Sequence, residues 1–166
     1  MNKRLKMLCI TAMGIALYVA LSMTIKIPIV GHIALDLGYI VLGVYCYLFG
    51  GAAGAVVGGA GCVLVSLLTS GWFPPGWLLG NLFIGVVCGK GYVREDNKRA
   101  HRMNYCLTYA AVFVGIAVIK PVVECILYQL PLWAKVSTSS IGAIMDALVM
   151  FIGLAIAPRL SRMVSR

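Results

Sequence analysis

The sequence predicts an all-α integral membrane protein with six transmembrane helices and both chain ends in the cytoplasm. Composition, a series of long apolar runs, and a one-sided distribution of basic residues support this prediction. Of the 166 residues, 61% are hydrophobic and 11% are charged, whereas soluble domains are roughly half apolar and about a quarter charged. Because a spanning helix needs about 20 residues, six helices use most of the chain and leave no room for a soluble domain.

Turn signals divide the chain, expected to form a single transmembrane domain over 1–166, into six apolar runs. The expected helices are about 7–25, 37–49, 52–70, 77–93, 103–129 and 138–157. The first follows a basic N-terminus, as in a signal peptide, but it is long enough to span and lacks a small-residue cleavage site, so we expect it to be retained. The second is short, which suggests a tilted or partly spanning helix.

The connections carry recognisable helix breakers. Glycines make 49–54 a tight turn, and the adjacent Pro74 and Pro75 exclude helix from 71–76. The segments 26–36 and 131–137 are expected to be loops, and Pro121 is expected to kink the fifth helix. The serines between 137 and 140 are candidate N-caps for the sixth helix.

Basic residues set the expected orientation. The N-terminus, the 90–102 turn and the C-terminal tail hold 11 of the 14 basic residues, while the opposite side holds only Lys26 and Lys135. Basic residues gather on the cytoplasmic side of membrane proteins. The net charge of +9 is therefore a topology signal, and no basic surface interleaved with aromatic residues indicates nucleic-acid binding.

A stripe of small residues runs along the first helix. Ala12, Ala16 and Ala20 are spaced by four, so they lie on one helix face. Small residues let helix backbones approach closely in lipid. The stripe is a candidate docking surface for another protein, and the alternative is packing within this chain.

Polar side chains at membrane depth indicate a binding site. Lys120 and Glu124 share a face of the fifth helix, Asp146 lies within the sixth, and Asn81 lies within the fourth. Such groups usually face a cavity or a partner. A structural Lys120–Glu124 ion pair is one alternative, and Asp146 could instead pair with Lys120 or bond a neighbouring hydroxyl. Asp36 and Tyr39 would close the same pocket from above.

All three tryptophans fall on the expected outer side. Trp72 and Trp133 lie in outer connections, and Trp77 lies just inside the fourth helix. Interfacial anchoring is the ordinary role of tryptophan at a membrane boundary. An even belt would place some at the inner side too, so the asymmetry favours an outward-facing aromatic pocket.

The motifs that would mark other functions are missing. The sequence holds no GxxxxGK[ST] nucleotide loop, no HExxH or GxSxG motif and no convincing internal repeat. Its six cysteines form no CxxC spacing, so no metal or cofactor is expected. Two other functions remain open: a stand-alone proton-coupled carrier that uses Lys120, Glu124 and Asp146, and a membrane enzyme with Asp146 or Glu124 as its acid or base.

These features together resemble the substrate-specific (S) components of energy-coupling-factor (ECF) transporters over essentially the whole chain. The resemblance rests on the alanine pattern at Ala12 and Ala16, and on Lys26-Ile-Pro-Ile with Leu35-Asp-Leu-Gly-Tyr39. It also rests on the glycines after Phe49 and on the run from Gly71-Trp-Phe-Pro-Pro-Gly to Asn81. The likeness is to the vitamin-binding branch that includes riboflavin, pantothenate and folate members.

The resemblance implies a subunit of an ATP-driven importer in a prokaryotic plasma membrane, without an ATPase site of its own. Such a subunit captures a vitamin-like micronutrient from outside and docks on a transmembrane coupling (T) component that carries two cytoplasmic ATPases. Here 26–36 and 71–76 would form the lid, and Ala12, Ala16 and Ala20 the docking surface. The expected substrate contacts are Asp36, Tyr39, Trp72, Trp77, Asn81, Lys120, Glu124, Trp133 and Asp146.

Overall fold

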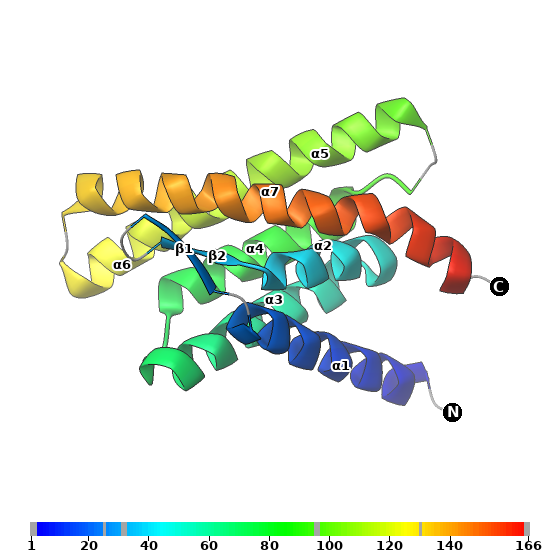
Figure 1. Ribbon diagram of the computed structural model, residues 1–166, viewed down its shortest axis with the longest axis horizontal. Helices are drawn as coiled ribbons and strands as arrows, with labels where there is room; N and C mark the ends of the chain where they lie inside the picture. The colour runs from blue at the N-terminus through cyan, green and yellow to red at the C-terminus, as the bar shows by residue number, and fades with distance from the viewer. Residues whose placement is uncertain (1–2, 25, 31–32, 95–96, 130, 165–166) are drawn as a thin grey trace.

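The computed structural model describes residues 3–24, 26–30, 33–94, 97–129 and 131–164, which form an almost entirely helical bundle (Figure 1). In chain order its elements are α1 (Lys3–Thr24), β1 (Lys26–Val30), β2 (Ile33–Asp36), α2 (Gly38–Phe49), α3 (Gly51–Ser70), α4 (Pro75–Gly91), α5 (Lys98–Val112), the π-helix η1 (Phe113–Ile119), α6 (Lys120–Tyr128) and α7 (Leu132–Val164).

Within the described residues, four helical segments are long and apolar enough to cross a membrane. They are Arg4–Thr24, Gly51–Ser70, Lys98–Tyr128 and Lys135–Met163. The apolar helix α2 has 12 residues and α4 has 17. At 1.5 Å per residue, α2 spans only about 18 Å, so its short length agrees with the sequence-based expectation of a helix that is tilted or partly spanning.

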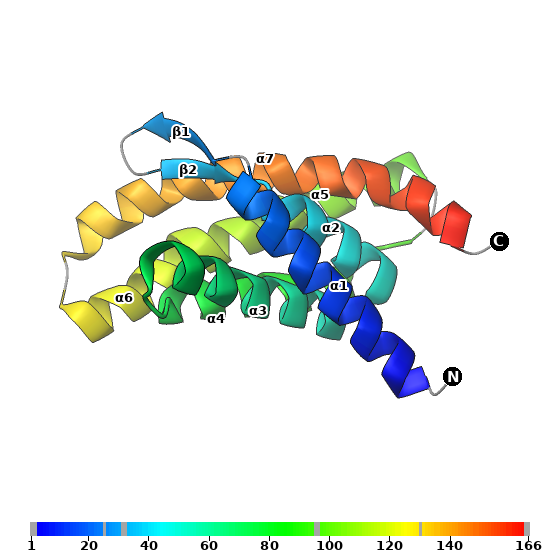
Figure 2. The ribbon, with the colours of Figure 1, turned by 60° about the horizontal axis from the view of Figure 1, so that its bottom comes forward.

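The two ends of the bundle differ in what they contain. The Lys3 end of α1 and the Val164 end of α7 lie at one end, together with the α2–α3 turn and the side of α4 that leads to α5 (Figure 1). The β1–β2 hairpin, the α3–α4 turn and the junction of α6 with α7 lie toward the other end (Figure 2). This arrangement matches the grouping of segments that the distribution of basic residues predicts.

The segment 26–36 was expected to be a loop, but it is a β-hairpin. Strands β1 and β2 pair antiparallel, with Lys26 opposite Asp36 and Ile27 opposite Leu35. Pro28 has no N–H to donate, which a strand tolerates at a sheet edge. The pairing satisfies backbone N–H and C=O groups of this connection without a helix. Backbone groups that pack against a membrane protein need such internal hydrogen bonds.

The segment 131–137 was also expected to be a loop, but α7 begins at Leu132 and runs through Pro158 to Val164. The serine side chains fit inside this helix. Ser137 Oγ donates to the Trp133 carbonyl at 2.8 Å, and Ser140 Oγ donates to the Val136 carbonyl at 2.7 Å. These hydroxyls bond carbonyls one turn earlier, as they do inside helices, and do not cap a helix start.

The expected helix 103–129 is longer and irregular. It begins at Lys98, where the Asn97 side chain accepts from the Arg99 N–H at 3.4 Å, and its middle is the π-helical stretch η1. Pro121, which cannot donate a backbone hydrogen bond, is the second residue of α6, after Lys120. The irregularity thus lies before Pro121, and Lys120 sits at the junction of η1 and α6.

Glycines allow α3 and α4 to pack with their backbones in contact. A Cβ at Gly85 would meet the backbone of Ala55 and Gly54, and one at Gly89 would meet the backbone of Gly51. Gly51, Gly54 and Ala55 lie in the first turns of α3. Small residues at such crossings commonly allow helices to associate closely in lipid. The hydrophobic effect does not drive this association, because lipid tails are as apolar as the side chains.

A pair of glycine substitutions tests this crossing. We expect Gly85→Ala to destabilise the protein by about 1–3 kcal/mol, because the added methyl has no space and the helices must separate. Gly142→Ala is the control, since nothing lies within 4 Å of a Cβ there, and it should be neutral or stabilising by up to about 1 kcal/mol. Thermal unfolding in detergent measures both; equal midpoints would contradict the proposed backbone contact.

Candidate binding site

Asp36, at the end of β2, connects the hairpin to two helices. Its Oδ2 accepts a hydrogen bond from the Tyr18 hydroxyl at 3.3 Å, and its Oδ1 accepts from Ser22 Oγ and, at 2.8 Å, from the Gly38 N–H. Tyr18 and Ser22 lie on α1 and are buried. A carboxylate at this depth needs several donors, and here α1 and the first residue of α2 supply them.

Directly after Asp36, α2 points Tyr39 toward α4. The Trp77 Nε1–H donates to the Tyr39 hydroxyl at 3.2 Å, and Asn81 Nδ2 donates to the Trp77 carbonyl at 3.0 Å. Tyr39 and Asn81 are fully buried, and Asn81 Oδ1 has no hydrogen-bond partner among the described residues. An orphaned buried acceptor is unusual in a native protein and costs stability, so this carbonyl is suited to receive a donor from a ligand.

Lys120 and Asp146 complete the arrangement. The Lys120 ammonium lies 5.7 Å from the centre of the Trp77 ring, a cation–π distance. Asp146 is 9% exposed and interacts electrostatically with Asp36 and Lys120, while the Tyr39 hydroxyl is close enough to interact with its carboxylate. A buried carboxylate and a half-buried ammonium therefore share one region with an aromatic face.

We call this group of side chains the polar cluster. It consists of Tyr18, Ser22, Asp36, Tyr39, Trp77, Asn81, Lys120 and Asp146. They come from α1, β2, α2, α4, α6 and α7, and so the cluster is built by nearly the whole bundle. Acceptors, a cation and aromatic faces suit a small ring compound with polar substituents. In the described part of the chain, no three His, Cys, Asp or Glu side chains gather as a metal would require.

Three of the nine expected substrate contacts lie elsewhere. Glu124 pairs with Lys135 of α7 at 3.1 Å, so its ion pair is with Lys135, and the alternative of a Lys120–Glu124 pair was wrong. Trp72 is 57% exposed and packs on Tyr128 with ring centroids 5.5 Å apart. Trp133 is 87% exposed. The structure does not bring these three side chains into the cluster, and their contact with a substrate stays a prediction.

Two members of the cluster were missed in the sequence. Gly14, Tyr18 and Ser22 are spaced by four on α1, and this face is buried. A Cβ at Gly14 would meet the ring of Tyr45, and one at Gly38 would meet Tyr18 and Ser22. The sequence did contain a signal for this face: Tyr18 and Ser22 carry hydroxyls one turn apart within an apolar run. Polar groups within a membrane helix usually face the bundle interior.

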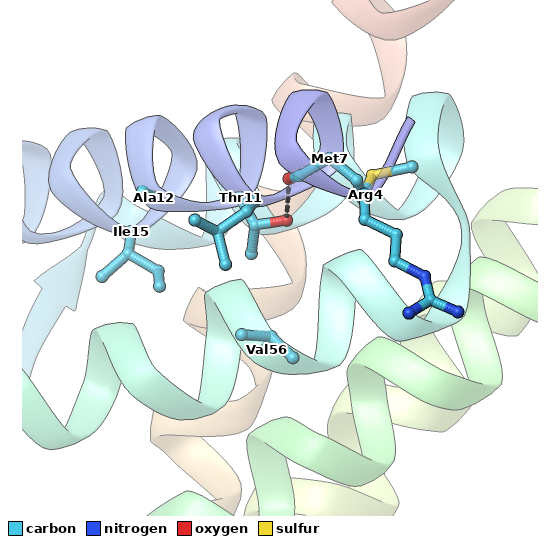
Figure 3. A pocket seen from close by; sticks show the side chains of 7 residues that line it. Arg4, Met7, Thr11, Ala12, Ile15 and Val56 are labelled. Atoms are coloured by element: carbon cyan, nitrogen blue, oxygen red, sulfur yellow. Dashed lines mark hydrogen bonds between the residues drawn. The ribbon is translucent and has the colours of Figure 1, made fainter. Parts of the chain in front are cut away.

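The outer face of α1 carries the alanine stripe. Ala12, Ala16 and Ala20 are exposed, so the rest of the described chain does not cover them, and internal packing does not explain the stripe. Next to it, a groove of about 500 Å³ runs between α1 and α3 (Figure 3). Its lining is almost wholly apolar and consists of Arg4, Met7, Leu8, Thr11, Ala12, Ile15 and Val56.

Comparisons with known proteins agree with this architecture. The UPF0397 protein YdcD of Lactococcus lactis subsp. lactis (strain IL1403) is 32% identical over 152 residues, which cover 86% of this chain and 81% of that protein. A UPF0397 protein of Lactococcus lactis subsp. cremoris (strain NZ9000) is 29% identical over 157 residues, covering 89% and 85%. Neither name states a substrate.

The fold matches a solved structure at low sequence identity. The crystal structure of the S-component for biotin from an ECF-type ABC transporter superposes with a TM-score of 0.72 at 16% identity, covering 98% of this chain and 95% of that one. The model of the family described as "ECF-type riboflavin transporter, S component" matches residues 2–161. These findings confirm the resemblance seen in the sequence: the chain belongs to the family of ECF-type riboflavin transporter S components.

Proposed function

We propose that this chain is the substrate-binding subunit of an ATP-driven ECF importer and that the polar cluster is its binding site. The observation that carries the proposal is the set of buried polar groups between α1, α2, α4, α6 and α7, one of which, Asn81 Oδ1, lacks a partner in the described structure. Polar groups at membrane depth are costly and usually serve a pathway or a ligand. Family membership supplies the type of transporter.

The proposed topology has six spans with both chain ends in the cytoplasm. The longer helices supply four spans, and α2 and α4 supply the other two. The basic 90–102 region and both ends of the described chain then face the cytoplasm together, as basic residues do in inner membranes. The hairpin and the α3–α4 turn face outward, where a substrate would arrive.

We propose a vitamin or related micronutrient as the substrate. The family description names riboflavin, and the solved structure with the similar fold is an S-component for biotin, so both are the first compounds to test. A ring would lie against Trp77 and Tyr39. Asn81 Oδ1 and the Asp146 carboxylate would accept hydrogen bonds, and Lys120 would face an oxygen of the substrate. The hairpin, held through Asp36, would close over the site.

For docking, we propose the outer face of α1. Ala12, Ala16 and Ala20 form a smooth exposed stripe, and the apolar groove begins beside Ala12. A helix of a T component can approach this face closely because no large side chain stands on the stripe. The T component and its two ATPases would supply the energy, because the sequence has no nucleotide loop of its own.

A stand-alone proton-coupled carrier is the second candidate. Buried Asp146, which interacts electrostatically with Lys120, favours it, since acidic groups within membrane helices form proton relays in pumps and transporters. Substrate uptake by liposomes that contain only the purified chain distinguishes the two functions. A subunit binds substrate without sustained uptake, whereas a carrier takes up substrate when a proton gradient is applied. Uptake by the chain alone would refute the subunit proposal.

A lysine pair tests the binding site. We expect Lys120→Gln to weaken ligand affinity about ten- to a hundredfold, since a charge-assisted hydrogen bond is worth about 1.5–3 kcal/mol. Lys135→Gln is the matched control, because Lys135 pairs with Glu124 outside the cluster, and its affinity should be unchanged. The ligand is first identified by mass spectrometry of compounds that co-purify with the protein, and its binding is then measured by calorimetry. Equal affinities in the two variants would show that Lys120 does not contact the ligand.

An alanine pair tests the docking surface. We expect Ala16→Trp to retain ligand binding but to prevent assembly with the T component, because a large ring on the stripe holds the partner helix away. Ala155→Trp places the same ring at an exposed position of α7 and should assemble normally. Co-purification with the T component and its ATPases is the measurement. Assembly of both variants to the same extent would rule out docking through the stripe.

A further inference from the structure

Cys62 of α3 lies beside the polar cluster. It is fully buried, and it interacts electrostatically with Asp36 and Lys120. A Cβ at Gly58 would lie 3.5 Å from the Cβ of Asn81, and Cys62 follows Gly58 by one turn on the same face of α3. This helix supplies none of the side chains that define the cluster, but it brings a thiol next to Asn81.

The hydrogen bonds of Cys62 leave its sulfur as an acceptor. The thiol donates to the Gly59 carbonyl, with Sγ 3.2 Å from the oxygen. A thiol has one proton, so the sulfur can only accept from its other neighbours. The Asn81 side chain forms a hydrogen-bonding contact with Cys62. Because Asn81 Oδ1 has no partner among the described residues, this contact is made by Nδ2.

These contacts determine the orientation of the Asn81 amide. Its Nδ2 carries two hydrogens: one bonds the Trp77 carbonyl at 3.0 Å, and the other is directed to the Cys62 sulfur. The reversed amide would place Oδ1 against the Trp77 carbonyl oxygen, and two acceptors would then face each other. With both N–H groups of the amide in use, Oδ1 is the group that remains for a ligand.

We propose that Cys62 is a positioning residue of the substrate site: its sulfur holds the second Asn81 N–H, so that Asn81 Oδ1 stays available to a hydrogen-bond donor of the substrate. Without this acceptor, the amide is held only at Trp77 and can rotate about its Cβ–Cγ bond, a torsion with a broad preference. The inference rests on the proposed function, because only a ligand in the polar cluster would use Oδ1.

The test compares three cysteine variants of the full chain in detergent, with riboflavin and biotin as probes and calorimetry as the measurement. C62A removes the acceptor and should weaken binding about two- to tenfold, the effect of one hydrogen bond. C62S should bind like the wild type, because a hydroxyl can donate to an earlier carbonyl and still accept from an N–H. C46A is the matched control: Cys46 is equally buried but lies on the Gly85 carbonyl, with Sγ 3.7 Å from that oxygen, and its loss should leave the affinity unchanged.

A second measurement needs no ligand. In the NMR spectrum of protein labelled at asparagine nitrogen, the two side-chain proton signals of Asn81 are assigned by their loss in N81L. One of them should shift in C62A, and both should keep their positions in C46A.

Unchanged Asn81 signals in C62A would overturn the proposal, as would equal losses of affinity in C62S and C62A. Shifted signals with unchanged affinity in C62A would also refute the positioning role. If the signals shift but the wild type binds neither probe, the Cys62–Asn81 contact is supported and the two proposed substrates are refuted.

Discussion

The carboxylate of Asp36 is the constraint on which the hairpin end of this bundle depends. A half-buried carboxylate is costly without hydrogen-bond donors, and three donors to Asp36 come from α1 and from the first residue of α2. The hairpin, α1 and α2 are thereby held as one unit over the polar cluster. Hydrogen bonds to a charged group contribute about 1.5–3 kcal/mol each, so lifting the hairpin from the bundle costs free energy unless water or a ligand replaces these donors.

The glycines of α3 serve the same region from the other side. A Cβ at Gly61 would meet the ring of Tyr18, and one at Gly58 would meet Leu42 and lie 3.5 Å from the Cβ of Asn81. The absence of side chains at these positions allows a tyrosine and an asparagine to enter the bundle between helices. Close helix packing and the buried polar site are consequently not separate features, because the same glycine-rich helix makes room for both.

Much of this architecture could be predicted from the sequence because lipid restricts the choices. Apolar runs mark helices, and polar groups within them are expected to turn inward, which is why Asn81, Lys120 and Asp146 were expected to share one region. The structure brings them together with Asp36, Tyr39 and Trp77, and their contact with a substrate stays a prediction. The rotational positions of α6 and α7 were not predictable. The π-helical stretch before Lys120 alters the phase of the helix, and α7 starts early enough for Lys135 to reach Glu124. Trp72 and Trp133 were assigned by their side of the membrane alone, which does not determine where a ring points.

The two faces of α1 connect the proposed binding site with the proposed docking surface. The inner face holds Tyr18 and Ser22 on Asp36, while the outer face exposes Ala12, Ala16 and Ala20. A rigid helix cannot shift on one face alone. If a partner docks on the alanine stripe as proposed, any displacement of α1 would move the Tyr18 and Ser22 donors of Asp36 and weaken the attachment of the hairpin. Conversely, a ligand that orders Asp36 fixes the position of α1 and so the surface presented to the partner. Thermodynamic linkage requires that the ligand changes the affinity for the partner by the same factor as the partner changes the affinity for the ligand. In this proposal, α1 is the element that couples the two sites.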